Sequence, residues 1–239
     1  SVSVRGAGTV SSTALSNDAT GIIGPWARQG TGTSTRYATV GGGNVVGYTG
    51  GTSVTAAGVT DTTGTANYDV TATGTLGAGA SFNTLRYTAG SGTLSGAYTA
   101  NGILNSGTDQ VTLSGAATIG ADKELILTAP DTTRRITLSG QVSDNPGGAS
   151  GITLTGGGRA DLTASNTYSG ITVINAGQLY ISNSSALGST NGHTVIYSSS
   201  SSVTGGQLVV LGNITIREPI TIVGRGDAAP YSQAIRVNG

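Results

Sequence analysis

The chain has 239 residues, 41 of them glycine, and its 11 basic and 11 acidic residues cancel to a formal net charge of zero. This balance disfavours nucleic acid and anionic membranes as partners, because both attract clustered Lys and Arg. The chain contains no cysteine, which excludes disulfides and thiolate metal sites but is compatible with export. Hydrophobic residues make up 36% of the sequence and occur in short ordered groups, so we expect the chain to fold.

No apolar run approaches the ~20 residues that a membrane-spanning helix needs, so membrane insertion is not expected. The sequence begins at Ser1 and contains no methionine. We interpret Ser1 as a processed N-terminus or as the start of a fragment.

Residues 1–10 alternate small polar and apolar side chains, including Val2 and Val4, which predicts a short strand. Between residues 11 and 35 the alternation is lost, and this range contains the only tryptophan, Trp26. We predict that residues 1–35 form a strand and an irregular cap folded over the first coil of the part that follows. Trp26 could stack on a sugar ring, but a packing role is favoured because large aromatic side chains mostly serve burial.

From residue 36 to residue 239, short apolar groups separated by turn residues predict a series of strands. Two or three strands per coil would give coils of roughly 20 to 30 residues, as in parallel β-helices. No stretch shows the apolar stripe of an amphipathic helix. The predicted strands are Tyr37–Val40, Asn44–Tyr48, Tyr68–Thr71, Leu85–Tyr87, Val111–Leu113, Leu125–Leu127 and Ile136–Leu138. The most apolar passage of the chain comprises Leu208–Leu211 and the isoleucines 214, 216, 220 and 222.

The clearest unit spans residues 151–183. Its apolar residues form pairs spaced by two, which places both members of a pair on one face of a strand. Such pairs build a continuous core only when successive coils stack in register. We therefore predict a single elongated all-β domain, a parallel β-helix, over residues 36–239. The side chains predicted to point inward are Leu162, Val173, Leu179 and Ile181.

The same unit resembles a known family. The blocks Gly156-Gly157-Gly158, Asn166-Thr167-Tyr168-Ser169-Gly170 and Asn175-Ala176-Gly177-Gln178-Leu179 are similar to the autotransporter-associated, or passenger-associated, β-strand repeat of bacterial secreted proteins. This resemblance implies a location outside the cell or on the bacterial surface. The chain departs from the family at Arg159-Ala160-Asp161-Leu162, where a charge pair beside the strand is expected. Asn166 and Asn175 are predicted to bond turn backbone.

Candidate chemical sites are few. We interpret His193 as a solvent-exposed turn residue, because no partner that would orient a base can be named. A carbohydrate-cleaving β-helix would need paired carboxylates, but the acidic residues show no repeated pattern and are interpreted as solubilising turn charges. These acidic residues are Asp109, Asp122, Glu124, Asp131 and Asp144.

Three glycine-containing motifs are also weak. The residues from Gly156 to Asp161 give one imperfect echo of a calcium-binding repeat. Gly41-Gly42-Gly43 is predicted to be a turn, because no helix follows it to complete a phosphate site. Arg225-Gly226-Asp227 matches an adhesion tripeptide that arises easily by chance. We assign no catalytic, cofactor-binding or metal-binding residue.

The favoured hypothesis is a non-catalytic structural β-solenoid: a fibre, filament, sheath or adhesin shaft subunit. Its expected partners are copies of itself, joined head to tail through residues 1–10 and the apolar C-terminal coils, or the continuation of a larger surface protein. The alternatives are a polysaccharide lyase or hydrolase and a glycan-binding adhesin module that uses Trp26 and surface tyrosines.

Overall fold

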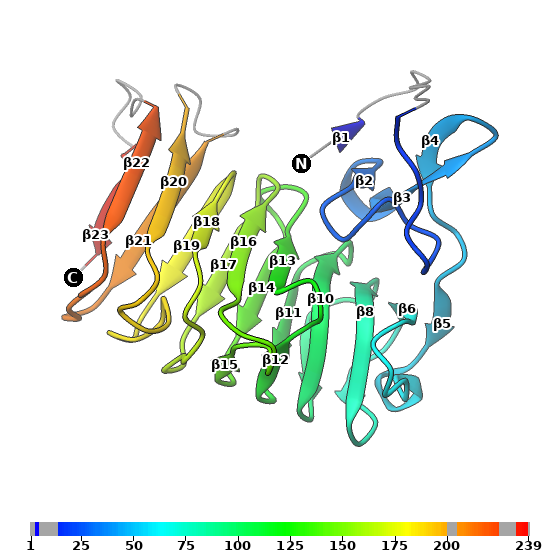
Figure 1. The fold of residues 1–239 in the computed structure, drawn as a ribbon, viewed down its shortest axis with the longest axis horizontal. Helices are drawn as coiled ribbons and strands as arrows, with labels where there is room; N and C mark the ends of the chain where they lie inside the picture. Colours follow the sequence, from blue (N-terminus) through cyan, green and yellow to red (C-terminus); the bar gives the residue numbers. More distant parts are fainter. Residues whose placement is uncertain (1–2, 5–13, 200–204, 225–232, 239) are drawn as a thin grey trace.

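The computed structural model describes residues 3–4, 14–199, 205–224 and 233–238. Most strands in this part of the chain belong to two long sheets, of 11 and 8 strands, and a separate sheet of four strands lies at the N-terminal end (Figure 1). All strand pairs within the two long sheets are parallel and join successive coils. One apolar cluster contains residues from both long sheets. The prediction of an all-β parallel β-helix is therefore confirmed.

The strands are short, and the chain passes back and forth between the two long sheets, with one or two strands in the larger sheet before each strand of the smaller one. The larger sheet contains β5 (Thr52–Val54), β6 (Asn67–Val70), β8 (Ala80–Tyr87), β10 (Tyr98–Asn105), β12 (Ala117–Ile119), β13 (Glu124–Thr128), β15 (Val142–Ser143), β16 (Gly151–Thr155), β18 (Thr172–Ile174), β20 (Thr194–Ser198) and β22 (Ile220–Gly224). The smaller sheet contains β7 (Gly74–Thr75), β9 (Gly92–Ser95), β11 (Gln110–Leu113), β14 (Arg135–Leu138), β17 (Arg159–Leu162), β19 (Gly177–Ile181), β21 (Gly206–Leu211) and β23 (Ile235–Asn238).

The N-terminal sheet contains β1 (Ser3–Val4), β2 (Arg28–Gln29), β3 (Arg36–Gly41) and β4 (Asn44–Gly47). The described helical segments are two short 3-10 turns, Gly32–Ser34 and Ala56–Gly58. The assignment of residues 36–48 to the solenoid was wrong, because β3 and β4 form an antiparallel hairpin outside the two long sheets. The solenoid strands begin at Thr52.

The N-terminal segment packs against the side of the solenoid. The amide Nδ2 of Asn67 donates to the Thr20 carbonyl at 3.0 Å, and that of Asn83 donates to the Thr20 hydroxyl at 2.8 Å. Ile22 and Tyr37 form a buried cluster with Leu104 of β10. These contacts lie on the outer face of β6, β8 and β10. The N-terminal segment was expected to cover the first coil. It lies instead along several coils of the larger sheet.

The core register confirms three of the four predicted inward positions. Leu162, Leu179 and Ile181 are at most 1% exposed. The prediction for Val173 was wrong, because its neighbours Thr172 and Ile174 are buried and Val173 is half-exposed.

The reason lies in Tyr168, which is fully buried and whose hydroxyl shares a 2.7 Å hydrogen bond with Oγ1 of Thr172. A buried phenol needs a hydrogen-bond partner. Placing Thr172 inward supplies that partner and turns Val173 outward.

The C-terminal predictions hold in part. β21 and β22 occupy the predicted apolar passage, whereas Ile214 and Ile216 lie outside any strand and are partly buried against the core. Pro219 immediately precedes β22, where its missing N–H costs no ladder bond. Its carbonyl accepts a 2.9 Å hydrogen bond from the backbone N–H of Thr194.

Candidate functional site

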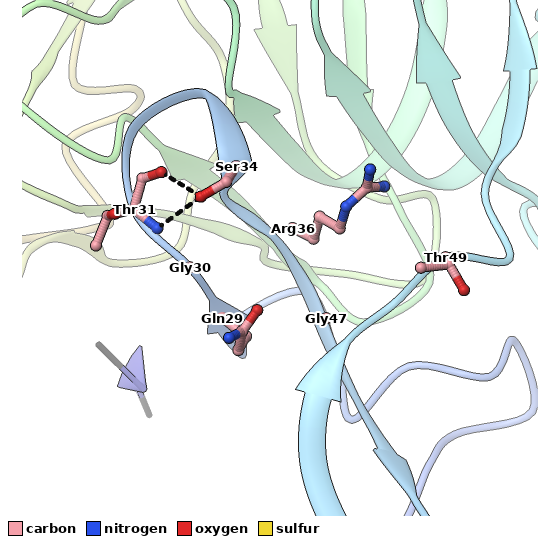
Figure 2. Close-up of a pocket in the computed structure, with 7 residues that line it drawn as sticks. All are labelled: Gln29, Gly30, Thr31, Ser34, Arg36, Gly47 and Thr49. Carbon is pink, nitrogen blue, oxygen red and sulfur yellow. Dashed lines mark hydrogen bonds between the residues drawn. The ribbon is translucent and has the colours of Figure 1, made fainter. Parts of the chain in front are cut away.

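One hollow of about 510 Å³ lies within the N-terminal segment, against β2, β3 and the end of β4 (Figure 2). Its walls carry one charged side chain, that of Arg36, and are otherwise polar or glycine. Ser34 Oγ donates to the Thr31 carbonyl at 2.6 Å and accepts from the Thr31 N–H at 3.3 Å, which fixes the turn at one wall. The lining residues are Gln29, Gly30, Thr31, Ser34, Arg36, Gly47 and Thr49.

Arg36 forms only a long ion pair with its acidic neighbour, Asp69. Its NH1 lies 3.4 Å from Asp69 Oδ2, whereas Arg86 binds the same carboxylate through Nε at 2.9 Å and NH2 at 3.0 Å. Asp69 is therefore held mainly by Arg86. The hollow offers a cation and polar groups, but its lining contains no acid–base pair.

A second hollow, of about 320 Å³, brings together three residues that sequence analysis considered separately: Trp26, Asp122 and Glu124. Trp26 is half-buried and packs with the apolar cluster of the N-terminal segment, as expected for a packing anchor. It also lines the hollow. The other lining residues are Asp18, Ile23, Gly24, Pro25 and Ile126.

Three carboxylates line this second hollow. Partial burial raises the pKa of Asp122, and repulsion from Asp18 and Glu124 raises it further. Asp18 accepts hydrogen bonds from Thr20, and Glu124 accepts one from the hydroxyl of Thr153. Asp122 thus keeps its proton to a higher pH than an ordinary aspartate, and Glu124 lines the same hollow.

The remaining acidic candidates lie apart in separate turns. Asp109 accepts from Ser91 at 2.5 Å, and Asp144 accepts from Ser169 Oγ at 2.7 Å. Asp131 pairs with Arg134 at 2.5 Å; burial opposes its ionisation, but hydrogen bonds from Arg134 and Thr133 outweigh burial and lower its pKa. All three acids are engaged in such contacts, Asp131 within its own turn and Asp109 and Asp144 with serines 18 and 25 residues away.

His193 and the glycine motifs within the described residues are not part of either hollow. His193 is half-buried, and its backbone carbonyl accepts from Thr172 at 3.0 Å. Gly42 and Gly43, with φ of 58° and 78°, form the turn between β3 and β4, as predicted. In the described ranges no group of three His, Cys, Asp or Glu side chains could hold a metal ion. Arg225-Gly226-Asp227 lies outside the described residues.

The structure also assembles a charged cluster that sequence reasoning captured only in part. Asp161 is 2% exposed although it lies on the outer face of β17, because two arginines cover it. Arg159 Nε lies 3.0 Å from Asp161 Oδ2, and Arg135 Nε of the preceding coil lies 2.6 Å from the same atom. The expected charge pair is confirmed. Arg135 was missed, but it pairs in register with Arg159, so the coil period could have revealed it.

Comparison with family models, with curated proteins and with solved structures gives no match to this chain. Among its described residues, no helix has the length and apolar character needed to cross a membrane.

Proposed function

We propose that this chain is a non-catalytic structural β-solenoid, acting as a shaft, fibre, filament or sheath segment of a secreted or bacterial cell-surface protein. The resemblance of residues 151–183 to passenger repeats supports the location. The stack of parallel strands supports a role as a rigid rod, since each coil contacts only its neighbours.

The proposal rests mainly on one observation: the strands at both ends of the stack are exposed. β22 and β23 are the last strands of their sheets, and three of their apolar side chains are exposed: Ile222 at 47%, Val223 at 42% and Val237 at 69%. β5 and β7 are the strands at the other end, and both are largely exposed. Among the residues that the structure describes, each of these end strands has one edge without a partner strand, and such an edge is a template for further pairing.

The strands at the two ends run in the same direction, so one end can pair with the other. All strands of the larger sheet run parallel, so β5 of one copy can continue the ladder after β22 of the next copy without a change of direction. Such a contact joins two different surfaces and propagates into a filament. We place it on these end strands rather than on residues 1–10, because Ser3 and Val4 already pair with β2 of the same chain.

Sedimentation velocity over a range of concentrations tests this proposal. The native chain should sediment faster as its concentration rises. Charges at the open end, in the double variant Ile222→Lys and Val237→Lys, should leave a monomer. The matched control is Ile171→Lys, since Ile171 is 44% exposed but lies in the middle of the stack. A native chain that stays monomeric at every concentration would leave only continuation within a longer chain and would overturn self-association.

A second candidate function is a carbohydrate-active or glycan-binding site at the Trp26 hollow. It is favoured by one observation, the meeting of Trp26 with Asp122 and Glu124. Asp122, with its raised pKa, would donate the proton to a leaving sugar oxygen, and Glu124 would act as base or nucleophile.

Activity assays on neutral and acidic polysaccharides test this candidate. Turnover that Asp122→Asn abolishes would replace the structural proposal by an enzymatic one. Absence of turnover, together with unchanged glycan binding by a Trp26→Ala variant, would remove the candidate.

A further inference from the structure

The outer face of the smaller sheet carries a row of side chains that we name the arginine strip: Arg135, Arg159, Asp161, Tyr180 and Arg236. These residues come from β14, β17, β19 and β23, so the strip follows the axis along which the coils stack. Adjacent strands lie about 4.8 Å apart, which gives the strip a length of roughly 19 Å over four steps.

The strip has more positive than negative charge. It contains three arginines and one aspartate, so its net charge is 3 − 1 = +2. Arg135 and Arg159 both bond to Asp161, which neutralises one of them. The Arg135 and Arg159 side chains remain 36% and 29% exposed, and neither donates a hydrogen bond from NH1 to another described residue. The zero net charge of the whole chain conceals this local excess.

The guanidinium groups are held in fixed positions. The guanidinium carbon of Arg159 lies 3.4 Å from the centre of the Tyr180 ring, a cation–π contact. Arg236 NH2 donates to the Tyr180 hydroxyl at 2.7 Å. A planar guanidinium that is already ordered loses little further entropy when it binds a planar anionic group.

Two polar atoms at this face lack a partner in the described part of the chain. They are Oγ1 of Thr137, which lies beside Asp161 in register, and Nε of Arg236. Both residues have their side chains on the outer face. Both atoms are enclosed by neighbouring groups, so the charged groups on this face that a ligand can reach are the partly exposed guanidinium groups of Arg135 and Arg159.

We propose that the arginine strip binds an acidic polysaccharide that lies along the stacking axis. Its carboxylate or sulfate groups would be held by Arg135, Arg159 and Arg236. Gln178, which is partly exposed beside the strip and donates to the buried Gln207 at 2.8 Å, would hydrogen-bond sugar hydroxyls. Because the arginine side chains are partly exposed, dissolved salt screens their attraction to an anionic polymer, and binding should weaken as the salt concentration rises.

Affinity electrophoresis and calorimetry of the full chain test this with three probes: polygalacturonate, dextran sulfate and neutral dextran. We expect binding to one or both acidic polymers, no binding to dextran, and a lower affinity at high salt. Arg135→Gln and Arg236→Gln should each weaken binding roughly 10-fold, as for loss of one charged hydrogen-bonding group. Arg135→Lys, which keeps the charge, should lose less.

The matched control is Arg36→Gln. Arg36 is also 36% exposed and also paired with an aspartate, but it lies in the N-terminal segment away from the strip. Its substitution should leave binding unchanged. Arg236 does not bond to Asp161, so its variant provides a test even where loss of Arg135 impairs folding.

Four results would overturn the proposal. They are the absence of binding to either acidic polymer, equal binding to neutral dextran, equal losses in the strip variants and in Arg36→Gln, and equally strong binding to double-stranded DNA. The last result would identify a general polyanion surface rather than a polysaccharide site.

Discussion

Arg236 donates a 2.7 Å hydrogen bond to the hydroxyl of Tyr180, and Val209 lies between these two residues in the register of β19, β21 and β23. Val209 faces outward yet is fully buried. The bond therefore spans an outward-facing apolar side chain and joins the coils on either side of it. The outer face of the smaller sheet is stabilised in this way by side chains as well as by its backbone ladder.

Tyr180→Phe should destabilise the chain, because Arg236 loses the acceptor of a charge-assisted bond. We expect a loss of about 1 kcal/mol in the free energy of unfolding, measured by urea denaturation. Tyr197→Phe is the control, since Tyr197 is 45% exposed. Equal effects from the two variants would show that the hydroxyl of Tyr180 contributes nothing specific.

Leu179→Ala and Val173→Ala should differ sharply. Leu179 is fully buried in the core, so its truncation should cost about 2–4 kcal/mol through lost transfer energy and a cavity. Val173 is half-exposed, and its truncation should cost less than about 1 kcal/mol. Thermal and urea unfolding measure both. A large loss for Val173→Ala would mean that the register of β18 is shifted by one residue.

Thr172→Val should leave the buried hydroxyl of Tyr168 without a partner and cost about 1–3 kcal/mol. Replacing both partners, by Thr172→Val and Tyr168→Phe together, should recover much of that loss, because neither side then buries an unpaired hydroxyl. A double-mutant cycle from unfolding free energies gives the coupling. Strictly additive effects would contradict the pairing.

The hydrogen bonds to Asp61 should make the stability of the folded chain depend on pH. Burial opposes ionisation of this carboxyl, but hydrogen bonds from the Thr63 hydroxyl and from the N–H groups of Thr63, Ala66 and Thr65 outweigh it and lower the pKa to about 2. The unfolded value is about 3.9. The stabilisation by the carboxylate is therefore complete above about pH 4 and is lost as the pH falls through about 2.

Asp61→Asn should accordingly lower the melting temperature at pH 6, and the difference should shrink between pH 4 and pH 2. Because Asp61 is largely accessible to solvent, the loss should not exceed about 1 kcal/mol. A difference that stays constant over this range would show that the carboxylate charge is not involved.

The repeat allowed much of the solenoid to be predicted, since a spacing of two identifies strand faces wherever the core is purely apolar. It failed at β18 because the core there includes Thr172, and a polar residue is placed inward only by a distant partner such as Tyr168. The two strands and the turn at residues 36–47 were predicted, but their antiparallel pairing outside the solenoid was missed. Alternating residues indicate a strand but do not specify which sheet it joins or in which direction.

Contacts between coils were the least predictable part of the structure. Asn166 bonds turn backbone as predicted, because its Nδ2 donates to the carbonyl of Ala186 at 2.6 Å, but that turn is 20 residues away rather than local. Its Oδ1 accepts from the Val142 N–H at 2.8 Å, so the side chain joins neighbouring coils. The meeting of Trp26 with Asp122 likewise depends on how the N-terminal segment lies across the sheet. Such partners are far apart in sequence, and local patterns carry no signal for them.

Negative-stain electron microscopy of the purified chain at increasing concentration tests the central claim most directly. A solenoid that stacks end to end through β5 and β22 should give unbranched filaments one solenoid wide, whose length increases with concentration. The Ile222→Lys and Val237→Lys variant should give short single particles. Uniform short particles from the native chain at every concentration would contradict end-to-end assembly.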